Sequence, residues 1–336
     1  MFKQLFMTAI IMAASLVGSS YASAETYNLT LSGASPGGLW SRIGTGVDAA
    51  IAQAYPGSTV TYQPSSGGFA NAVMVSKGKV PMGIISDSGL TVAITGAYPL
   101  KKPVTDLRVL FRLYQPESRF QQSFLAVTKK FADKHNIKSF NDAVNKKLAM
   151  RVVVNIRGAI DTEISKEAMA GFGISESIIK SWGGQVINAA AKEAGSLLGD
   201  GRADVLFLGV SFNHPYIRQM VKHTDLVLLE YGPAIANRVA TKFGASVCGV
   251  KPGEYKWAPT TNVTTICHGA VVIVNKSMSN QQAYNITKAM VEQIESYKNN
   301  SHRLIKKTAT PAVLAGSGNA PTHPGAIKYF KENGLM

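Results

Sequence analysis

The feature that most constrains this chain is a regular alternation of short β-branched runs with amphipathic stretches. The pattern predicts strands at 27–31, 58–63 and 82–85, separated by helices at 40–55 and 68–77. Such a strand-helix-strand order is typical of an α/β fold, and we expect largely parallel sheets.

The alternation resumes in the second half of the chain, and 336 residues are enough for two lobes that each bury a core. Strands are predicted at 150–154, 205–208, 226–229 and 270–274, and helices at 161–172, 189–198, 214–222 and 280–297. A short last helix is expected to begin at Pro324, because proline is favoured in the first turn of a helix.

The first 24 residues have the pattern of a signal peptide. Lys3 precedes an apolar stretch at 5–17, and Ala22-Ser23-Ala24 supplies the small residues that a signal peptidase accepts. The apolar stretch is shorter than the roughly 20 residues of a membrane-spanning helix. We therefore expect cleavage after Ala24 and export to the periplasm, with no lipid anchor, since no cysteine stands at the cleavage point.

The formal net charge of +15 invites a nucleic-acid function, but the basic residues are isolated or paired, as at Lys101-Lys102. No basic arm is present, so no nucleic-acid partner is expected. Cys248 and Cys267 either form a disulfide, worth about 3 kcal/mol, or are two buried free thiols. Neither the cysteines nor the six histidines show metal-ligand spacing, so no metal and no cofactor are predicted.

Four small, polar loops follow predicted strands, at 33–38, 65–68, 86–89 and 157–159. In α/β sheets ligands bind at the carboxyl ends of strands, where helix N-termini present free N–H groups and a positive dipole end. Each loop taken alone is ordinary turn chemistry. Together they predict one composite anion-binding cleft.

The first loop also satisfies the GxSxG pattern of a hydrolase, with Ser35 as the nucleophile. In that mechanism the N–H of the next residue stabilises the oxyanion, and here that residue is Pro36, which has no N–H. The sequence therefore disfavours an exported hydrolase. No P-loop or dinucleotide fingerprint follows any predicted strand.

Several segments resemble the TAXI-type solute-binding proteins of tripartite ATP-independent periplasmic (TRAP) transporters. The similar segments lie at 37–44, 65–71, 77–84 and 188–207, and Pro321-Thr322-His323-Pro324-Gly325-Ala326 is the most specific. The resemblance spans nearly the whole chain after residue 24. His323 is expected to fix the last helix rather than to act as a catalyst.

The resemblance implies a two-lobe, type II-like periplasmic-binding-protein fold that closes by a hinge on a solute in the cleft between the lobes. By chain order, lobe I is expected at 25–128 plus 268–336 and lobe II at 129–267. The resemblance also implies delivery of the solute to TRAP membrane permease subunits. We expect the protein to act as a monomer and not as an enzyme.

Arg157 is the residue expected to hold a carboxylate, although it is equally a solvated arginine or a partner for Asp161. Trp40 either stacks on the solute or belongs to the core, and Asp87 either accepts a hydrogen bond from the solute or caps a helix. The full set of predicted ligand-binding residues is Ser35, Gly38, Trp40, Ser66, Gly67, Asn71, Ser86, Asp87, Arg157, Gly158, Asp161 and Ser211.

Some of these residues depart from the family pattern. Trp40 and Ser41 replace two tyrosines, and Arg157-Gly158-Ala159 replaces a Pro-Gly-Ser segment. The glutamate or glutamine usual in that family therefore does not carry over directly. The expected solute is a small organic anion, a carboxylate or dicarboxylate, with an amino acid such as glutamate among the candidates. The alternatives are the exported hydrolase using Ser35 and a surface antigen without a transport role.

Overall fold

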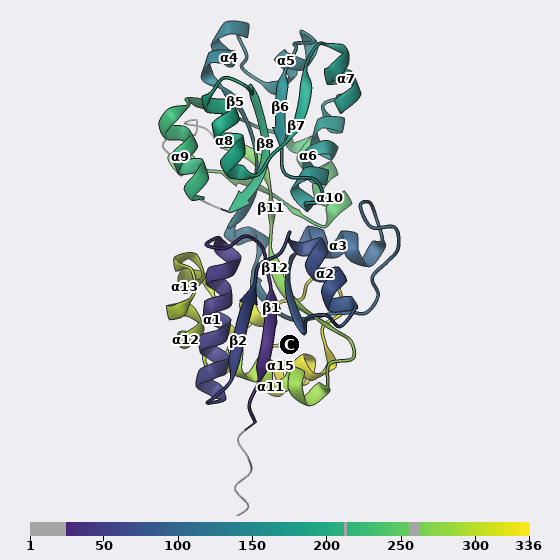
Figure 1. Ribbon diagram of the computed structural model, residues 1–336, viewed down its shortest axis with the longest axis vertical. Helices are drawn as coiled ribbons and strands as arrows, with labels where there is room; N and C mark the ends of the chain where they lie inside the picture. The colour runs from purple at the N-terminus through teal and green to yellow at the C-terminus, as the bar shows by residue number, and fades with distance from the viewer. Residues whose placement is uncertain (1–24, 212–213, 256–261) are drawn as a thin grey trace, which may run out of the picture.

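The computed structural model describes residues 25–211, 214–255 and 262–336, which form two α/β lobes stacked along the long axis of the molecule (Figure 1). The α/β two-lobe expectation is confirmed. The predicted signal peptide at 1–24 lies outside the described residues. Within these residues, no helix combines the length and the apolar character that crossing a bilayer requires.

Lobe I is built on a five-stranded sheet in the order β2-β1-β3-β12-β4. Its strands are β1 (Asn28–Ser32), β2 (Thr59–Gln63), β3 (Met82–Ser86), β4 (Leu107–Tyr114) and β12 (Ala270–Asn275). Its helices are α1 (Leu39–Ala54), α2 (Gly68–Ser76), α3 (Asp87–Thr95), α11 (Asn280–Glu292), α12 (Ile294–Asn300), α13 (Arg303–Thr308), α14 (Pro311–Ala315) and α15 (Pro324–Glu332). The helix expected at 280–297 is divided at Gln293, where the backbone leaves helical geometry.

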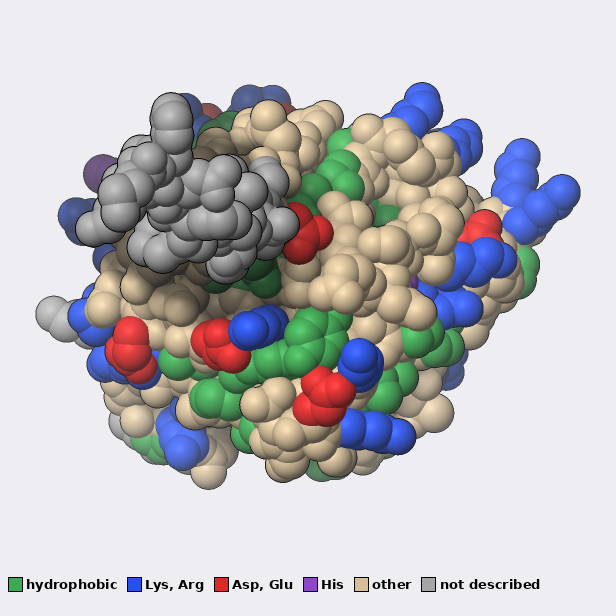
Figure 2. All heavy atoms as spheres, turned by 90° about the horizontal axis from the view of Figure 1, so that it is seen from below, with side chains coloured by type: hydrophobic (Ala, Val, Ile, Leu, Met, Phe, Trp, Pro, Cys, Tyr) green, Lys and Arg blue, Asp and Glu red, His purple; other side chains and the backbone are tan. Residues whose placement is uncertain are grey.

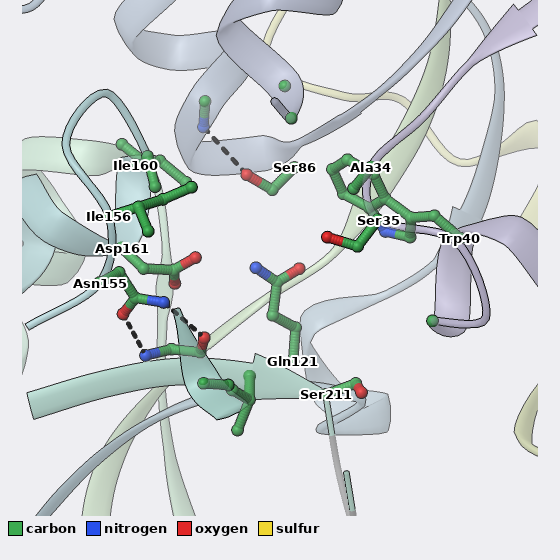
Figure 3. Close-up of a pocket in the computed structure, with 18 of the residues that line it drawn as sticks. Ala34, Ser35, Trp40, Ser86, Gln121, Asn155, Ile156, Ile160, Asp161 and Ser211 are labelled. Carbon is green, nitrogen blue, oxygen red and sulfur yellow. Dashed lines mark hydrogen bonds between the residues drawn. The ribbon is translucent and has the colours of Figure 1, made fainter. Parts of the chain in front are cut away.

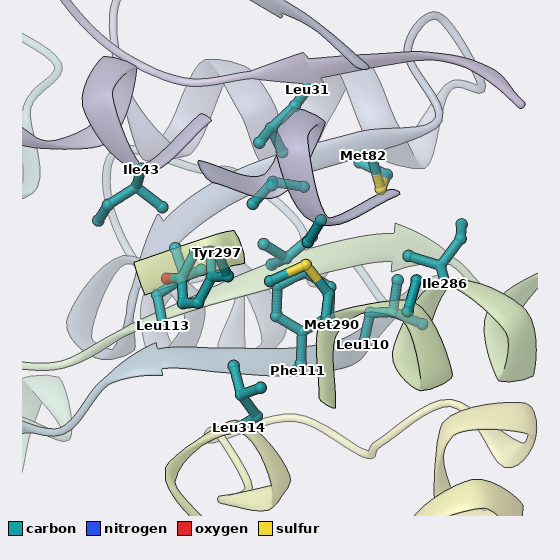
Figure 4. Close-up of a cluster of buried hydrophobic side chains, with 14 of the residues drawn as sticks. Leu31, Ile43, Met82, Leu110, Phe111, Leu113, Ile286, Met290, Tyr297 and Leu314 are labelled. Carbon is teal, nitrogen blue, oxygen red and sulfur yellow. The ribbon is translucent and has the colours of Figure 1, made fainter. Parts of the chain in front are cut away.

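The core of lobe I lies between this sheet and two sets of helices, α1 and the C-terminal helices (Figure 4). Leu31 of β1, Ile43 of α1 and Phe111 of β4 meet Met290 and Tyr297 from the C-terminal helices. All five are almost fully buried. The C-terminal segment therefore packs with the N-terminal strand in one core.

Lobe II is built on a seven-stranded sheet in the order β10-β11-β5-β8-β6-β7, with β9 paired to β5. Its strands are β5 (Gln121–Thr128), β6 (Arg151–Val154), β7 (Gln185–Asn188), β8 (Val205–Ser211), β9 (Leu226–Leu229), β10 (Ser246–Val250) and β11 (Val263–His268). Its helices are α4 (Lys129–His135), α5 (Phe140–Asn145), α6 (Ile160–Gly171), α7 (Glu176–Ser181), α8 (Ala191–Gly199), α9 (Pro215–His223) and α10 (Pro233–Phe243).

The sheets are mixed, so the expectation of largely parallel sheets is wrong. Only the pairs β1–β2, β1–β3, β6–β7 and β6–β8 are parallel. The sequence analysis did not predict five of the strands. Those at 107–114, 121–128, 246–250 and 263–268 pair antiparallel, and β7 at 185–188 pairs parallel with β6. Of these, β4, β5 and β11 flank the passages between the lobes, and β10 precedes β11 with no helix among the described residues between them.

The chain passes between the two sheets twice, through residues 115–120, which include the short 3₁₀ turn η1 (Pro116–Ser118), and through Gly269. β5 pairs with β8 and β9 in the second sheet, so the boundary expected at residue 128 falls after β5 instead of before it. We therefore propose lobe I as 25–114 plus 269–336 and lobe II as 121–268.

Cys248 of β10 and Cys267 of β11 form a disulfide, which decides between the two readings left open by the sequence. The two strands pair antiparallel, with Cys248 opposite Thr265. Their Cα atoms are 5.9 Å apart, within the range that a disulfide spans. The bond fastens an edge strand of lobe II to its neighbour.

The basic residues are mixed with acidic ones on the face shown in Figure 2, the lower end of lobe I in Figure 1. Lys298–Glu295, Lys276–Asp106 and Lys328–Glu332 are ion pairs on exposed parts of this lobe. On the face shown in Figure 2, charges of both signs are therefore interspersed.

Replacing both cysteines by serine is expected to lower the free energy of unfolding by about 3 kcal/mol, because the unfolded chain loses a closed loop. Urea denaturation of the oxidised protein and of the Cys248→Ser/Cys267→Ser variant measures this. Equal midpoints and slopes for the two proteins would contradict the disulfide.

Candidate functional site

A cavity of about 260 Å³ lies between the lobes. It is lined from both sides by the segments that follow the parallel strands β1, β2 and β3 of lobe I and β6, β7 and β8 of lobe II. Parallel strands end at the same edge of a sheet. Because the segments that follow them line the cavity, this edge of each sheet faces the other lobe. Nine of the twelve predicted residues line the cavity: Ser35, Gly38, Trp40, Ser66, Gly67, Ser86, Gly158, Asp161 and Ser211.

Six helices, α1, α2, α3, α6, α8 and α9, begin at this cavity. Four of them have no side-chain cap: their N-cap residues are Gly38, Gly67, Ala159 and Ala190. Most described helices that begin elsewhere are capped by a serine, threonine or histidine, as Ser279 caps α11. The uncapped N–H groups of α1, α2, α6 and α8 therefore have hydrogen-bonding capacity that an anion in the cavity can use.

Gly67 shows why glycine is needed in one of these turns. Its φ is +111°, a region that residues with a Cβ rarely adopt. The side chain of Ser65 accepts a hydrogen bond from the Gly67 N–H and fixes this turn.

A chain of hydrogen-bonded side chains at the cavity joins Trp40 and Tyr114 of lobe I to Gln121 of lobe II. The indole N–H of Trp40 donates to the Tyr114 hydroxyl at 3.0 Å, and that hydroxyl donates to Oε1 of Gln121 at 3.3 Å. Trp40 packs against the lobe I core and also lines the cavity, and its stacking on a solute stays a prediction. Figure 3 shows the hydroxyl of Ser35 and the amide of Gln121 turned toward the space between the lobes.

Lobe II contributes Asn155 and Asp161 on the opposite side (Figure 3). Asn155 exchanges two hydrogen bonds with the backbone of Gly209, its oxygen accepting at 2.9 Å and its amide donating at 3.2 Å. The Asp161 carboxylate lies directly over Gly209, where an added Cβ would come within 1.8 Å of Oδ1. Glycine at 209 is therefore required to make room for the carboxylate.

Asp161 is the one acidic residue that lines the cavity, and it is nine-tenths buried. Burial raises the pKa of its carboxyl to about 6, against the opposing effect of a hydrogen bond from the Gln121 side chain. Among the residues that the structure describes, no lysine or arginine lines this cavity. An anion bound here would thus meet neutral donors and one carboxyl group that is readily protonated.

A buried histidine lies behind Asp161. Nε2 of His268 is 3.9 Å from Oδ1 of Asp161, and neither atom has a hydrogen-bond partner among the described residues. Nδ1 of His268 is hydrogen-bonded to the Ser88 hydroxyl at 2.8 Å. Burial lowers the pKa of His268 to about 4, so the imidazole is neutral at pH 7 and gives Asp161 no compensating charge.

Three predicted residues do not line the cavity. Asn71 is fully buried, and its amide donates to the backbone oxygens of Gly33 and Ile84 at 2.8 and 2.7 Å. Its role is to fix the first loop to β3. Arg157 is exposed and donates to Oδ1 of Asn188 at 3.3 Å, so it neither faces the cavity nor pairs with Asp161.

Asp87 is the third, and it is occupied by a buried ion pair. Its two carboxylate oxygens accept from Nη1 and Nη2 of Arg112 at 2.9 and 3.0 Å, and both side chains are almost fully buried. The cap of α3 is supplied by the preceding Ser86, whose hydroxyl accepts from the Gly89 N–H. Neither reading made from the sequence, solute contact or helix cap, describes Asp87.

Sequence reading missed several lining residues, among them Tyr114, Gln121, Asn155 and His214. Asn155 directly follows the strand predicted at 150–154, and this position alone indicates a candidate cavity residue. Tyr114 and Gln121 stand at the facing ends of β4 and β5, neither of which was predicted as a strand.

The geometry gives no support to the hydrolase alternative. The Ser35 hydroxyl lines the cavity, but no hydrogen bond joins it to a histidine or carboxylate base among residues 25–211, 214–255 and 262–336. The same residues contain no cluster of histidine, cysteine, aspartate or glutamate that fits a metal ion.

Comparison with known proteins places the chain. Residues 31–334 match the NMT1-like family. The chain belongs to this family.

Two solved structures share the fold. PhnD1 from Prochlorococcus marinus (MIT 9301), in complex with methylphosphonate, superposes with a TM-score of 0.56 at 10% identity, over 92% of this chain and 99% of that one. MatC from Rhodopseudomonas palustris, with bound malate, gives a TM-score of 0.51 at 11% identity, over 86% of this chain and 93% of that one. Both similarities cover most of this chain and support the two-lobe fold over that length.

Replacing Asp87 by alanine should lower the free energy of unfolding by about 3–5 kcal/mol, because Arg112 is left buried without its partner. The matched control is Asp133→Ala, which breaks the exposed Lys129–Asp133 pair and should cost no more than about 1 kcal/mol. Urea denaturation of both variants decides the matter. Similar losses of unfolding free energy in the two variants would show that the buried Asp87–Arg112 pair contributes no more than the exposed one.

Asp161→Asn should stabilise the protein at pH 7 by about 3 kcal/mol. The pKa of Asp161 rises from 3.8 in the unfolded chain to about 6 in the folded one, and about two pH units correspond to that free energy. Because the folded state binds the extra proton between these values, the wild type loses stability relative to Asp161→Asn as the pH rises from about 4 to about 6. At pH 4 and below, the gain should vanish.

Urea denaturation of both proteins at pH 4 and pH 7 isolates this effect, since the opposite contribution of His268 is common to both. A stability difference that is the same at the two pH values would exclude a raised pKa at Asp161.

Proposed function

We propose that this protein is a periplasmic solute-binding protein that captures a small organic anion between its two lobes. The observation that carries the proposal is the convergence of four uncapped helix N-termini, two from each lobe, on one interlobe cavity. Malate and methylphosphonate, the ligands of MatC and PhnD1, are anions of suitable size, and this supports the same class here.

The ligand would be recognised mainly by neutral groups. Backbone N–H groups of the uncapped helices supply donors and the positive ends of helix dipoles, and Ser35, Ser66 and Gln121 supply side-chain hydrogen bonds. A carboxylate or dicarboxylate fits this set of donors. A cavity of about 260 Å³ limits the solute to a small metabolite.

Closure follows from the same contacts. An anion bound to N–H groups of both lobes interacts fully only when the lobes are together, so it favours the closed arrangement. We further propose that the loaded protein delivers its solute to a permease of the TRAP type, in line with the resemblance of 37–44, 65–71 and 321–326 to TAXI-type proteins. On this proposal the protein acts as a monomer and catalyses no reaction.

A panel of mono- and dicarboxylates, amino acids and neutral sugars, followed by thermal denaturation, tests the proposal. An anion present at 100 times its dissociation constant should add about 2.7 kcal/mol to the stability. A midpoint shift with neutral sugars alone would reject the anion class.

Ala191→Pro tests the helix N-termini directly. Ala191 is the first residue of α8 and lines the cavity, and proline at this position removes one N–H while it remains compatible with the helix. The variant should bind the anion about tenfold more weakly and keep its unliganded stability. The control is Asn280→Pro, the same change at the exposed start of α11, which does not face the cavity. Equal affinities in both variants would remove α8 from the site.

Asp161→Asn separates simple carboxylates from amino acids. A solute without a cation should bind more tightly to the variant at pH 8, because an ionised Asp161 repels it. The advantage should disappear at pH 5, where the wild-type carboxyl is largely protonated. If only amino acids bind, and bind Asp161→Asn more weakly, the carboxyl instead pairs with an ammonium group and the simple-carboxylate assignment is wrong. Isothermal titration at the two pH values measures this.

A further inference from the structure

A second cavity, of about 320 Å³, lies at the mouth of the cleft. We call it the basic pocket, and its charged and titratable lining residues are Arg42, His214, Arg218, His302 and Arg303. Arg42 comes from α1, and His302 and Arg303 from the start of α13, all in lobe I. His214 and Arg218 come from α9 in lobe II.

The positive charge of this pocket is not neutralised. No acidic residue lines it. None of its three arginines has an ion-pair partner within 25–211, 214–255 and 262–336, whereas Arg112, Arg119, Arg151 and Arg238 all do. Three guanidinium groups that face one space without a counter-charge repel one another.

The two histidines respond to the same field. Burial lowers the pKa of His214, and the charge of Arg218 lowers it further. Burial likewise lowers the pKa of His302, with further contributions from Arg303 and Arg42. Both imidazoles are therefore neutral at pH 7 and serve as hydrogen-bonding groups rather than as additional cations.

The hydrogen bonds of the two histidines indicate which ring nitrogen carries the proton. Nδ1 of His214 accepts from the Tyr216 N–H, and Nδ1 of His302 accepts from the Leu304 N–H, each at 3.2 Å. A neutral imidazole that accepts through Nδ1 carries its proton on Nε2. Each histidine thus offers one N–H in addition to the guanidinium groups.

The basic pocket adjoins the solute cavity. Gly38, Leu39, Ser211 and His214 line both. Cationic groups from the two lobes meet at the mouth of the cleft, so an anion placed among them would touch both lobes and remove the repulsion that opposes their approach.

We propose that the basic pocket is a second anion site, which binds a doubly charged oxyanion group and thereby bridges α1 and α13 of lobe I to α9 of lobe II. A dianion is favoured over a monoanion because three cations face it. The group is either a free inorganic anion such as phosphate or the far end of a dianionic solute whose other end occupies the adjoining cavity. The free-anion form does not depend on the proposed function, whereas the solute form rests on it.

Inorganic phosphate at pH 7.5 and low ionic strength is the first probe, measured by isothermal titration. The wild type should bind one phosphate per chain, and Arg218→Gln and Arg42→Gln should each weaken binding at least about fivefold. Arg202→Gln is the matched control, because Arg202 is an exposed arginine of lobe II outside both cavities. It removes the same net charge and should change the affinity less than twofold.

Succinate and its monoamide, succinamate, form the second arm, because they have the same length and differ by one charge. If the solute supplies the anionic group, the wild type prefers succinate, and Arg218→Gln and Arg42→Gln lose that preference while Arg202→Gln keeps it. If a free anion supplies the anionic group, the three arginine variants have the same preference for succinate over succinamate. Only phosphate binding is then weakened by Arg42→Gln and Arg218→Gln.

The proposal is overturned if neither phosphate affinity nor the succinate preference responds to Arg218→Gln and Arg42→Gln more than to Arg202→Gln. Its failure is distinguishable from failure of the proposed function. If the wild type binds none of the organic anions, but binds phosphate in a way that depends on Arg42 and Arg218, the proposed function alone is rejected. Binding of organic anions that depends on Ala191 but not on these arginines rejects the basic pocket alone.

Discussion

The buried ion pair between Asp87 and Arg112 fixes the place where the two lobes meet. Arg112 lies on β4, just before the first passage to lobe II, and Asp87 begins α3 beside the second. The Asp87 N–H donates to the carbonyl of Gly269 at 3.0 Å, and an added Cβ at 269 would lie 2.3 Å from Nη1 of Arg112 and from Oδ2 of Asp87. The guanidinium also reaches the carbonyl oxygen of Ser317 near the C-terminus. This ion pair therefore connects the start of α3, the end of β4, the passage at Gly269 and the C-terminal segment at Ser317.

The binding cavity depends on this arrangement. Ser86, which caps α3, and Tyr114 and Gln121, which flank the first passage, are held by backbone adjacent to the ion pair, and all three line the cavity. On the far side, Ser88 and His268 connect the same region to the back of Asp161. The result is a cavity without a cation among the described lining residues: Arg112 is neutralised by Asp87 and Arg157 faces solvent. Asp161 is the one acidic group among them, and burial raises its pKa to about 6. Recognition of an anion is then left to oriented N–H groups, which require no buried cation.

Much of the fold and part of the site are readable from the sequence. The strand-helix alternation located β1, α1, β2, α2 and β3 within a residue or two, because each is a short, strongly patterned element. The glycine and serine loops identified six cavity residues, because loops after parallel strands share one edge of the sheet, and Trp40, Asp161 and Ser211 were predicted beside them. The antiparallel strands β4, β5, β10 and β11 were not predicted, because the described residues contain no α-helix between β4 and β5 or between β10 and β11, so the strand-helix alternation is absent there. The four-residue strand β7 was not predicted either.

The roles of individual side chains were less accessible. Whether Asp87 faces a ligand or Arg112 depends on a partner 25 residues away, and whether Arg157 enters the cleft depends on the turn that carries it. Gln121 becomes a cavity residue only because β5 pairs with β8 and places its first residue opposite Ser211. Each of these depends on tertiary pairing, which local periodicity does not report.

The central claim, that helix N-termini of both lobes hold an anion, is tested most directly by a crystal structure of the protein with the tightest-binding anion found. The account predicts that the anionic group lies within about 3 Å of backbone N–H groups at the start of α1 or α2 and of α6 or α8. An anion held by the Arg157 side chain, or bound to one lobe alone, would contradict it.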